Sequence, residues 1–170
     1  MIWKSHKITS AAIAYTLCLP LEGIIAVTVG SIIPDFLEFV FKFRLKHRGI
    51  THFWGLYVIA LLVVHYYPFA QPLIASLLTW LIFGCLLHIF EDSMSRSGVL
   101  FCPGIRGHYI KLGELYKTGE LSEFFTVLVL LSGCLLIKFL NVKFAGDNWI
   151  PEILFYKEIK KFTLYVQNLS

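Results

Sequence analysis

The chain has 170 residues, of which 57% are hydrophobic and 15% are charged, and its formal net charge is +4. Its mean hydropathy is +0.72, whereas a soluble domain carries roughly a quarter charged residues, so the composition argues against a soluble protein and leaves an unusually apolar soluble bundle as the weaker alternative. The four cysteines form no C-x-x-C pair, which argues against a disulfide framework and a zinc–thiolate site.

The first two predicted helices are short. Apolar runs cover residues 8–19 and 21–33, interrupted at Pro20 and ending at Pro34. Each is shorter than the ~20 residues of a full membrane span. They predict either a helical hairpin that dips into the bilayer or one span kinked at Pro20, and the sequence leaves both open. The basic, then apolar start also fits a signal peptide, but no small-residue cleavage pattern follows, so we expect this segment to be retained.

Three longer apolar segments follow, at residues 51–67, 72–94 and 122–140. Thr51 is the predicted N-cap of the first of them, and Pro72 suits the first turn of the second. A glycine-rich polar loop separates the second from the third. The C-terminal tail has apolar residues near one helical face with lysines between them, which predicts a helix on the membrane surface.

These elements predict an all-α integral membrane bundle of about five hydrophobic helices with a C-terminal amphipathic helix. We divide it into a membrane-embedded metal-binding helical domain, residues 1–121, and an additional membrane helix with the tail, residues 122–170. Basic residues concentrate in the loops on one side, with the tail lysines as the exception. That side is therefore expected to be cytoplasmic.

Ionisable residues collect at the helix ends that face these basic loops. They come from four separate segments and comprise His6, Asp35, Glu38, His47, His52, His88, Glu91 and Asp92. His88 and Asp92 are spaced i, i+4, which puts both on one helix face, but Glu91 at i+3 leaves the choice of carboxylate open. Because ionisable groups at membrane depth are costly, they indicate a function. Nitrogen and oxygen donors together suit zinc, manganese or iron.

Each of these residues alone has a structural explanation. His6 could be an interfacial residue, Asp35 could end a helix, and Arg48 could anchor the chain on the cytoplasmic side. His65 and His108 have no partners at helical spacing and are interpreted as structural. The convergence of four segments, not any single residue, favours a metal site.

Five stretches carry a family resemblance: SHKITSAAIA, GSIIPDFLE, HRGITHFW, GCLLHIFED and SGVLFCPG. The chain resembles the YdjM-like inner-membrane proteins, which are described as membrane-bound metal-dependent hydrolases and have been likened to all-helical zinc-dependent phospholipases. HRGITH is the specific part of the match, which covers about Ser5 to Gly104. The tail after Gly113 lies outside it.

The resemblance implies a set of metal ligands. They are His6, Asp35, His47, His52, His88 and Asp92, so that Asp92 is favoured over Glu91. The family often has a second aspartate two residues after the first, where this chain has Leu37, and Glu38 could replace it. Six ligands exceed a closed zinc site, so we expect one or two divalent ions, zinc first with manganese or iron as alternatives, and in the two-ion case a bridging carboxylate.

The function expected from this resemblance is hydrolysis of a phosphoester in a lipid or lipid-linked substrate, at a multi-pass protein of the inner membrane. Arg48 would stabilise phosphate charge, and Glu38 or Glu91 would act as general base. The other partners expected are membrane lipids, and no nucleic acid. The alternatives are a non-catalytic adaptor with a structural metal, and a transporter of divalent cations or protons, against which the apolar outer halves of the helices argue.

Overall fold

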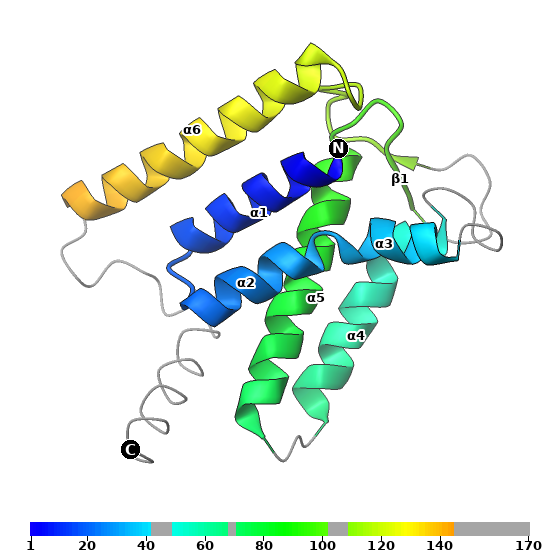
Figure 1. Cartoon of the computed structure of the whole chain (residues 1–170), viewed down its shortest axis with the longest axis vertical. Helices are drawn as coiled ribbons and strands as arrows, with labels where there is room; N and C mark the ends of the chain where they lie inside the picture. Colours follow the sequence, from blue (N-terminus) through cyan, green and yellow to red (C-terminus); the bar gives the residue numbers. More distant parts are fainter. Residues whose placement is uncertain (42–48, 68–70, 102–108, 145–170) are drawn as a thin grey trace.

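The structure, a computed structural model, describes residues 1–41, 49–67, 71–101 and 109–144, which are mostly helical (Figure 1). The elements are α1 (Trp3–Thr16), α2 (Leu21–Gly30), α3 (Ile33–Val40), the 3₁₀ turn η1 (Ile50–His52), α4 (Trp54–Tyr66), α5 (Pro72–Ser93), β1 (Val99–Leu100), β2 (Tyr109–Ile110) and α6 (Leu121–Phe144). His47, Arg48, His108 and the predicted amphipathic tail lie outside the described residues.

The central element is α5, which contacts α1, α2, α3 and α4. Pro72 stands in its first turn, as predicted, where the missing N–H costs no helical hydrogen bond. In Figure 1, α6 runs alongside α1 rather than against α5, and helices α3 and α4 lie on the other side of the bundle. The fifth predicted segment is α6, slightly longer than expected.

Two helix boundaries differ from the prediction. The second helix does not end at Pro34, because α2 ends at Gly30 and the chain resumes as α3 with Pro34 in its first turn. Asp35 therefore begins a helix instead of closing one. Thr51 is not an N-cap, since α4 begins at Trp54 with Phe53 before it, and the Thr51 hydroxyl instead donates a hydrogen bond to Glu38. At the first boundary the cause is Pro34, which suits the first turn of a new helix. At the second it is the tertiary hydrogen bond from Thr51 to Glu38.

The loop predicted between the last two long helices is not wholly irregular. It contains a small antiparallel sheet in which Val99 pairs with Ile110 and Leu100 with Tyr109. Backbone hydrogen bonds from Leu112 to Ser93 and from Leu115 to Met94 fasten the loop to the end of α5. The loop therefore covers the end of α5 at which His88 and Asp92 stand.

Two of the described helices are long and apolar enough to cross a membrane, α5 with a mean hydropathy of 2.2 and α6 over residues 121–140 with 2.1. The pair α2 and α3 passes the same test together, with a 41° bend at the break, which gives up to three spans. The predicted count of about five membrane helices is therefore not confirmed, because α4 is an apolar helix of only 13 residues.

Burial in this bundle is the reverse of that in a soluble domain. Large apolar side chains face outward on α2, α4 and α6, whereas polar and ionisable side chains of α1, α3, η1 and α5 are buried. Within α6 only 6% of the spanning window is buried. Such a distribution suits a chain whose helices are surrounded by hydrocarbon, which solvates apolar side chains but not charges.

Helices α2 and α5 touch through two glycines. A Cβ atom added to Gly30 would lie 2.0 Å from the carbonyl oxygen of Leu81, and one added to Gly84 would lie 2.1 Å from that of Val27. Small residues allow this kind of backbone contact between membrane helices. Ser31 directly follows Gly30, and His88 lies one turn after Gly84, so the contact sets the spacing of the polar end of the bundle.

We predict that Gly84→Ala destabilises the protein by about 1–3 kcal/mol, because the added methyl group meets backbone that cannot move aside. The measurement is the midpoint of thermal unfolding in detergent. Gly133→Ala on α6 is the matched control, since no atom lies within 4 Å of its Cβ position, and its midpoint should stay or rise slightly. Equal midpoints for the two variants would contradict the proposed close contact.

Candidate metal centre

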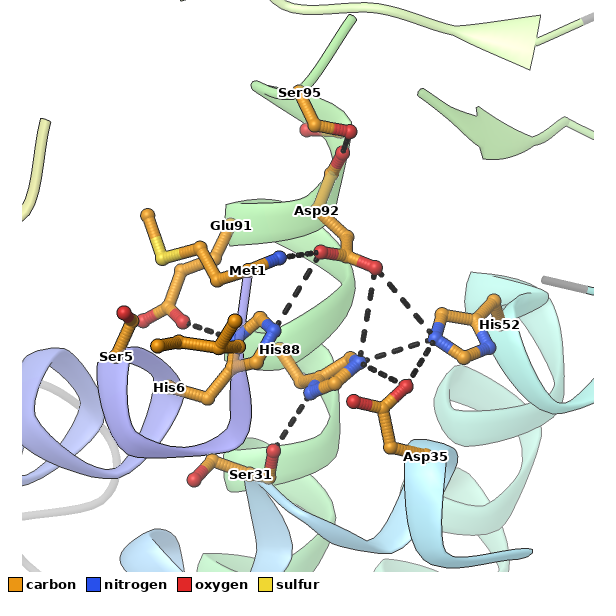
Figure 2. A network of polar contacts seen from close by, with 12 residues as sticks. Met1, Ser5, His6, Ser31, Asp35, His52, His88, Glu91, Asp92 and Ser95 are labelled. Carbon is orange, nitrogen blue, oxygen red and sulfur yellow. Dashed lines mark hydrogen bonds and ion pairs between the residues drawn. The ribbon is translucent and has the colours of Figure 1, made fainter. Parts of the chain in front are cut away.

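Four elements bring ionisable side chains to one point at the end of the bundle (Figure 2). The side chains are His6 from α1, Asp35 from α3, His52 from η1, and His88 with Asp92 from α5. His6, His52 and His88 are fully buried, and Asp92 is nearly so. The structure thus brings together five of the six predicted ligands, and the sixth, His47, lies outside the described residues.

Four of these side chains form a compact donor set. The Nε2 atom of His52 lies 3.1 Å from Nε2 of His88, 3.3 Å from Oδ1 of Asp35 and 3.6 Å from Oδ2 of Asp92. His88 Nε2 lies 3.6 Å and 3.9 Å from the same two oxygens. Ligand bonds of about 2.0 Å in a tetrahedral zinc site place donor atoms about 3.3 Å apart. The observed distances lie near or somewhat above that value, so Asp35, His52 and His88, which form one group of mutually close donors, could hold one zinc ion with Asp92 beside them.

His6 adds a second group of donors. Its Nε2 atom is buried without a hydrogen-bond partner and lies 3.5 Å from Oδ1 of Asp92. Its ring stacks on that of His88, with 3.8 Å between centroids and an interplanar angle of 25°. A buried nitrogen without a partner is costly, and a cation beside Asp92 would supply one. Asp92 therefore presents one oxygen to His52 and His88 and the other to His6.

The opposite nitrogen of each histidine is held by an acceptor. Nδ1 of His88 donates to the carbonyl oxygen of Ser31 at 2.7 Å, Nδ1 of His52 lies 3.0 Å from Glu38, and Nδ1 of His6 lies 2.6 Å from Glu91. A proton on Nδ1 leaves the Nε2 lone pair directed at the centre. Such carboxylate or carbonyl partners are the usual support of metal-binding histidines.

The two glutamates are held in place in turn. Glu91 is fully buried and accepts hydrogen bonds from Thr9 at 2.6 Å and Ser10 at 3.4 Å. Thr51 donates to Glu38 at 2.9 Å, and the Tyr57 hydroxyl donates to the Thr51 carbonyl at 2.8 Å. Both glutamates, predicted as candidates for a general base, thus contact the Nδ1 atom of a histidine, on the side of the ring away from Nε2.

The Met1 amino group and the Tyr116 hydroxyl lie beside Asp92 near the start of α1. The amino group of Met1 lies 2.5 Å from Oδ1 of Asp92 and 3.2 Å from the hydroxyl of Tyr116, which donates to the carbonyl of Glu91. Sequence reasoning missed Tyr116 and Ser31, for which no spacing or motif gives a signal. It could have found Thr9, which lies three residues after His6 and so shares its helix face.

The electrostatics favour positive charge at this point. Burial lowers the pKa of His52, but its hydrogen bonds to Asp35 and Glu38 and the negative charge of Asp92 outweigh that effect and raise the pKa to about 9. For His6, burial likewise acts to lower the pKa, and the contacts with Asp92 and Glu91 raise it above the ordinary value. Metal ions compete with such protons, because a histidine ligand must be neutral.

Comparison with known proteins gives one match. The sequence model of the family described as YdjM inner membrane protein matches residues 1–155, a longer stretch than the one that carries the recognised motifs. Searches of curated proteins and of solved structures gave no significant match.

We predict a specific pH dependence for the metal-free protein. Because the pKa of His52 is raised from 6.5 to about 9, its protonated form stabilises the fold fully below pH 6.5, and this stabilisation is lost as the pH rises through about 9. A shift of this size corresponds to about 3 kcal/mol at most. Thermal unfolding in detergent with a chelator, from pH 6 to pH 10, measures it.

Glu38→Gln is the variant that tests this assignment, since it removes the negative charge beside Nδ1 of His52 while preserving the shape of the side chain. The fall in unfolding temperature between pH 7 and pH 10 should become smaller in this variant. The same fall in both proteins would show that His52 is not responsible for it.

Proposed function

The chain belongs to the YdjM inner membrane protein family, and on that premise we propose that it is a membrane-bound metal-dependent hydrolase acting on a phosphoester of a lipid or lipid-linked substrate. The observation that carries the proposal is the orientation of three buried histidines. Each has Nδ1 held by an acceptor and Nε2 directed at one or both of two aspartates. This arrangement is typical of metal ligands and unusual for structural histidines.

The first ion would be held by Asp35, His52, His88 and one oxygen of Asp92. Charge supports it, since the carboxylates of Asp35 and Asp92 are gathered at an end of the bundle where water is scarce, and a divalent cation offsets the cost of their burial. Mixed nitrogen and oxygen donors favour zinc, with manganese or iron as alternatives.

A second ion would be held by His6 and Asp92, with His88 in the same group of mutually close donors. The rings of His6 and His88 stack with 3.8 Å between centroids. Their ring nitrogens would therefore be available to two neighbouring ions, which together would stabilise the attacking and leaving oxygens of a phosphoester.

Bound metal would supply an acidified water near neutral pH and neutralise phosphate charge. The chain itself contributes the orientation of the reacting groups. His52 and His88 are fixed by Glu38 and Ser31, and His6 by Glu91. We therefore assign Glu38 and Glu91 as positioning residues in preference to a general base. Arg48, outside the described residues, keeps its proposed role at the phosphate because a guanidinium forks onto two oxygens.

The membrane setting follows the positive-inside rule. Basic residues stand at the same end of the helices as the candidate centre: Lys4, Lys7, Arg96, Lys111 and Lys117. The connections at the opposite end, residues 17–20 and 67–71, carry no lysine or arginine. Lys138 of α6 is the exception at this end, because its side chain donates to Cys18. We propose a multi-pass arrangement in the inner membrane with the centre facing the cytoplasm.

One observation favours the adaptor as a second candidate. The donors of the first ion number four and are almost completely buried, and a zinc ion with four protein ligands is usually structural. A metal that only ties α3, η1 and α5 together would have the same ligands. Turnover, not metal content, separates the two functions.

We predict that zinc-loaded protein in detergent hydrolyses bis(p-nitrophenyl) phosphate or a phospholipid, and that His52→Ala lowers the rate by more than about 100-fold, because loss of a supporting residue alone costs about 10–100-fold. His65→Ala is the control, since His65 lies at the opposite end of α4 beside Tyr66, and its rate should match the wild type. Full zinc occupancy without turnover of either ester would favour the adaptor, and zinc flux into liposomes the transporter.

We also predict two zinc ions per chain in the wild-type protein and one in His6→Ala, because only the donor set around His6 is removed. Calorimetric titration of the metal-free protein with zinc measures both numbers. Circular dichroism verifies that the variant is folded. A single ion in the wild type, or none in the variant, would exclude the division of ligands proposed above.

A further inference from the structure

Among the candidate ligands that the structure describes, Asp35 is the most exposed. The side chain of Asp35 is 15% exposed, whereas those of His52 and His88 are 0% exposed and that of Asp92 3%. A molecule that approaches the donor atoms from outside therefore meets Asp35 first. The surroundings of Asp35 decide which molecules can do so.

The helix that carries Asp35 is strongly amphipathic. With 3.6 residues per turn, Glu38 lies on one flank of Asp35 and Phe39 on the other, one turn further on. Exposure rises across this arc from the buried Glu38 through Asp35 to Phe39, which is 63% exposed, and the next position, Phe36, is 49% exposed. The most exposed aromatic side chain of α3 thus stands beside the most exposed of the candidate ligands.

Neighbouring elements extend this apolar surface. α3 contacts η1, and η1 contacts β1. Trp54, the first residue of α4, donates a hydrogen bond to the carbonyl of Phe101, the residue that follows β1, at 3.2 Å. Ile50, Trp54 and Phe101 each expose more than a third of their surface. We call the set formed by Phe36, Phe39, Ile50, Trp54 and Phe101 the apolar rim. Figure 1 places its elements, α3, the start of α4 and β1, at one end of the molecule.

The rim is continuous with the membrane-crossing part of the chain. α2 and α3 together are long and apolar enough for one membrane span, with a 41° bend between them. The exposed phenylalanines of α3 therefore lie on a candidate membrane segment that also contains Asp35 of the candidate centre. An exposed aromatic face with a tryptophan is typical of the boundary between hydrocarbon and head groups. An apolar face of this kind would not bind a small ionic substrate that arrives from water.

We propose that the apolar rim binds the hydrocarbon chain of the lipid substrate, so that its phosphoester enters from the bilayer, past Phe39 and Asp35, to the metal. This inference rests on the proposed function, because it assigns a specificity surface to the same centre. Phe39 and Phe36 are its specificity residues. They recognise a long alkyl chain, and the metal site recognises the phosphorus group.

The experiment compares two non-hydrolysable probes with the same head group, hexadecylphosphonate and methylphosphonate, by calorimetry on zinc-loaded full-length protein in one detergent. In Phe39→Ser, the dissociation constant for hexadecylphosphonate should rise about tenfold, which is less than the loss of a fully buried phenylalanine would give. That for methylphosphonate should change less than about twofold. Phe39→Leu keeps an apolar side chain and should restore most of the lost affinity.

Phe125→Ser is the matched control, because Phe125 is 60% exposed on α6, which runs along α1 away from α3 (Figure 1). It should leave both dissociation constants unchanged. Bound zinc reports whether each variant is folded, and Phe36→Ser, with the same expected pattern, replaces Phe39→Ser if that variant binds no zinc.

Several results would overturn the proposal. They are equal weakening of both probes by Phe39→Ser, no weakening of either, the same weakening by Phe125→Ser, and wild-type binding of hexadecylphosphonate no tighter than that of methylphosphonate. Turnover is measured separately. A protein that shows the expected binding pattern but hydrolyses no ester would overturn the hydrolase proposal and leave the apolar rim intact.

Discussion

The burial of carboxylates and imidazoles at one end of an apolar bundle is the constraint on which the rest of this structure depends. Asp92 and Glu91 are almost wholly withdrawn from water, as are His52 and His88, and each such group is costly unless paired. The structure resolves this by giving His6, His52 and His88 each an acceptor at Nδ1 and leaving Nε2 directed at an aspartate. The remaining negative charge is the basis of the metal site proposed here.

Backbone geometry makes this pairing possible. The contact of α2 with α5 at Gly30 and Gly84 is close enough for the Ser31 carbonyl to reach Nδ1 of His88. On the other side, Pro34 starts a new helix, α3, whose first turn presents Asp35 and whose second presents Glu38. One end of the bundle is therefore polar and rigid, while its outer faces remain apolar and suited to lipid.

The candidate centre lies near one end of the bundle, where the proposed membrane arrangement brings it close to both lipid and water. It stands near the end of α5 rather than at the middle of the helix, which lowers the cost of the charges and, in the proposed membrane arrangement, would place them near the lipid head groups. α3 separates the two environments, because one of its faces supplies carboxylates to the centre and the other exposes Phe36 and Phe39. For the proposed hydrolase function, this setting would favour a lipid phosphoester over a soluble ester.

Hydropathy is a local property of the sequence, and it determined the membrane character and the long helices. The i, i+4 spacing of His88 and Asp92 likewise placed both side chains on one helix face. The family was also recognisable from HRGITH. The family resemblance favours Asp92 over Glu91, and the tertiary structure accordingly places Asp92 beside the three histidines and Glu91 at Nδ1 of His6. Tertiary structure alone decided that Ser31 holds His88 and that Thr51 bonds to Glu38 instead of capping a helix. These depend on which helix faces meet across distant segments, and spacing along one helix carries no information about that.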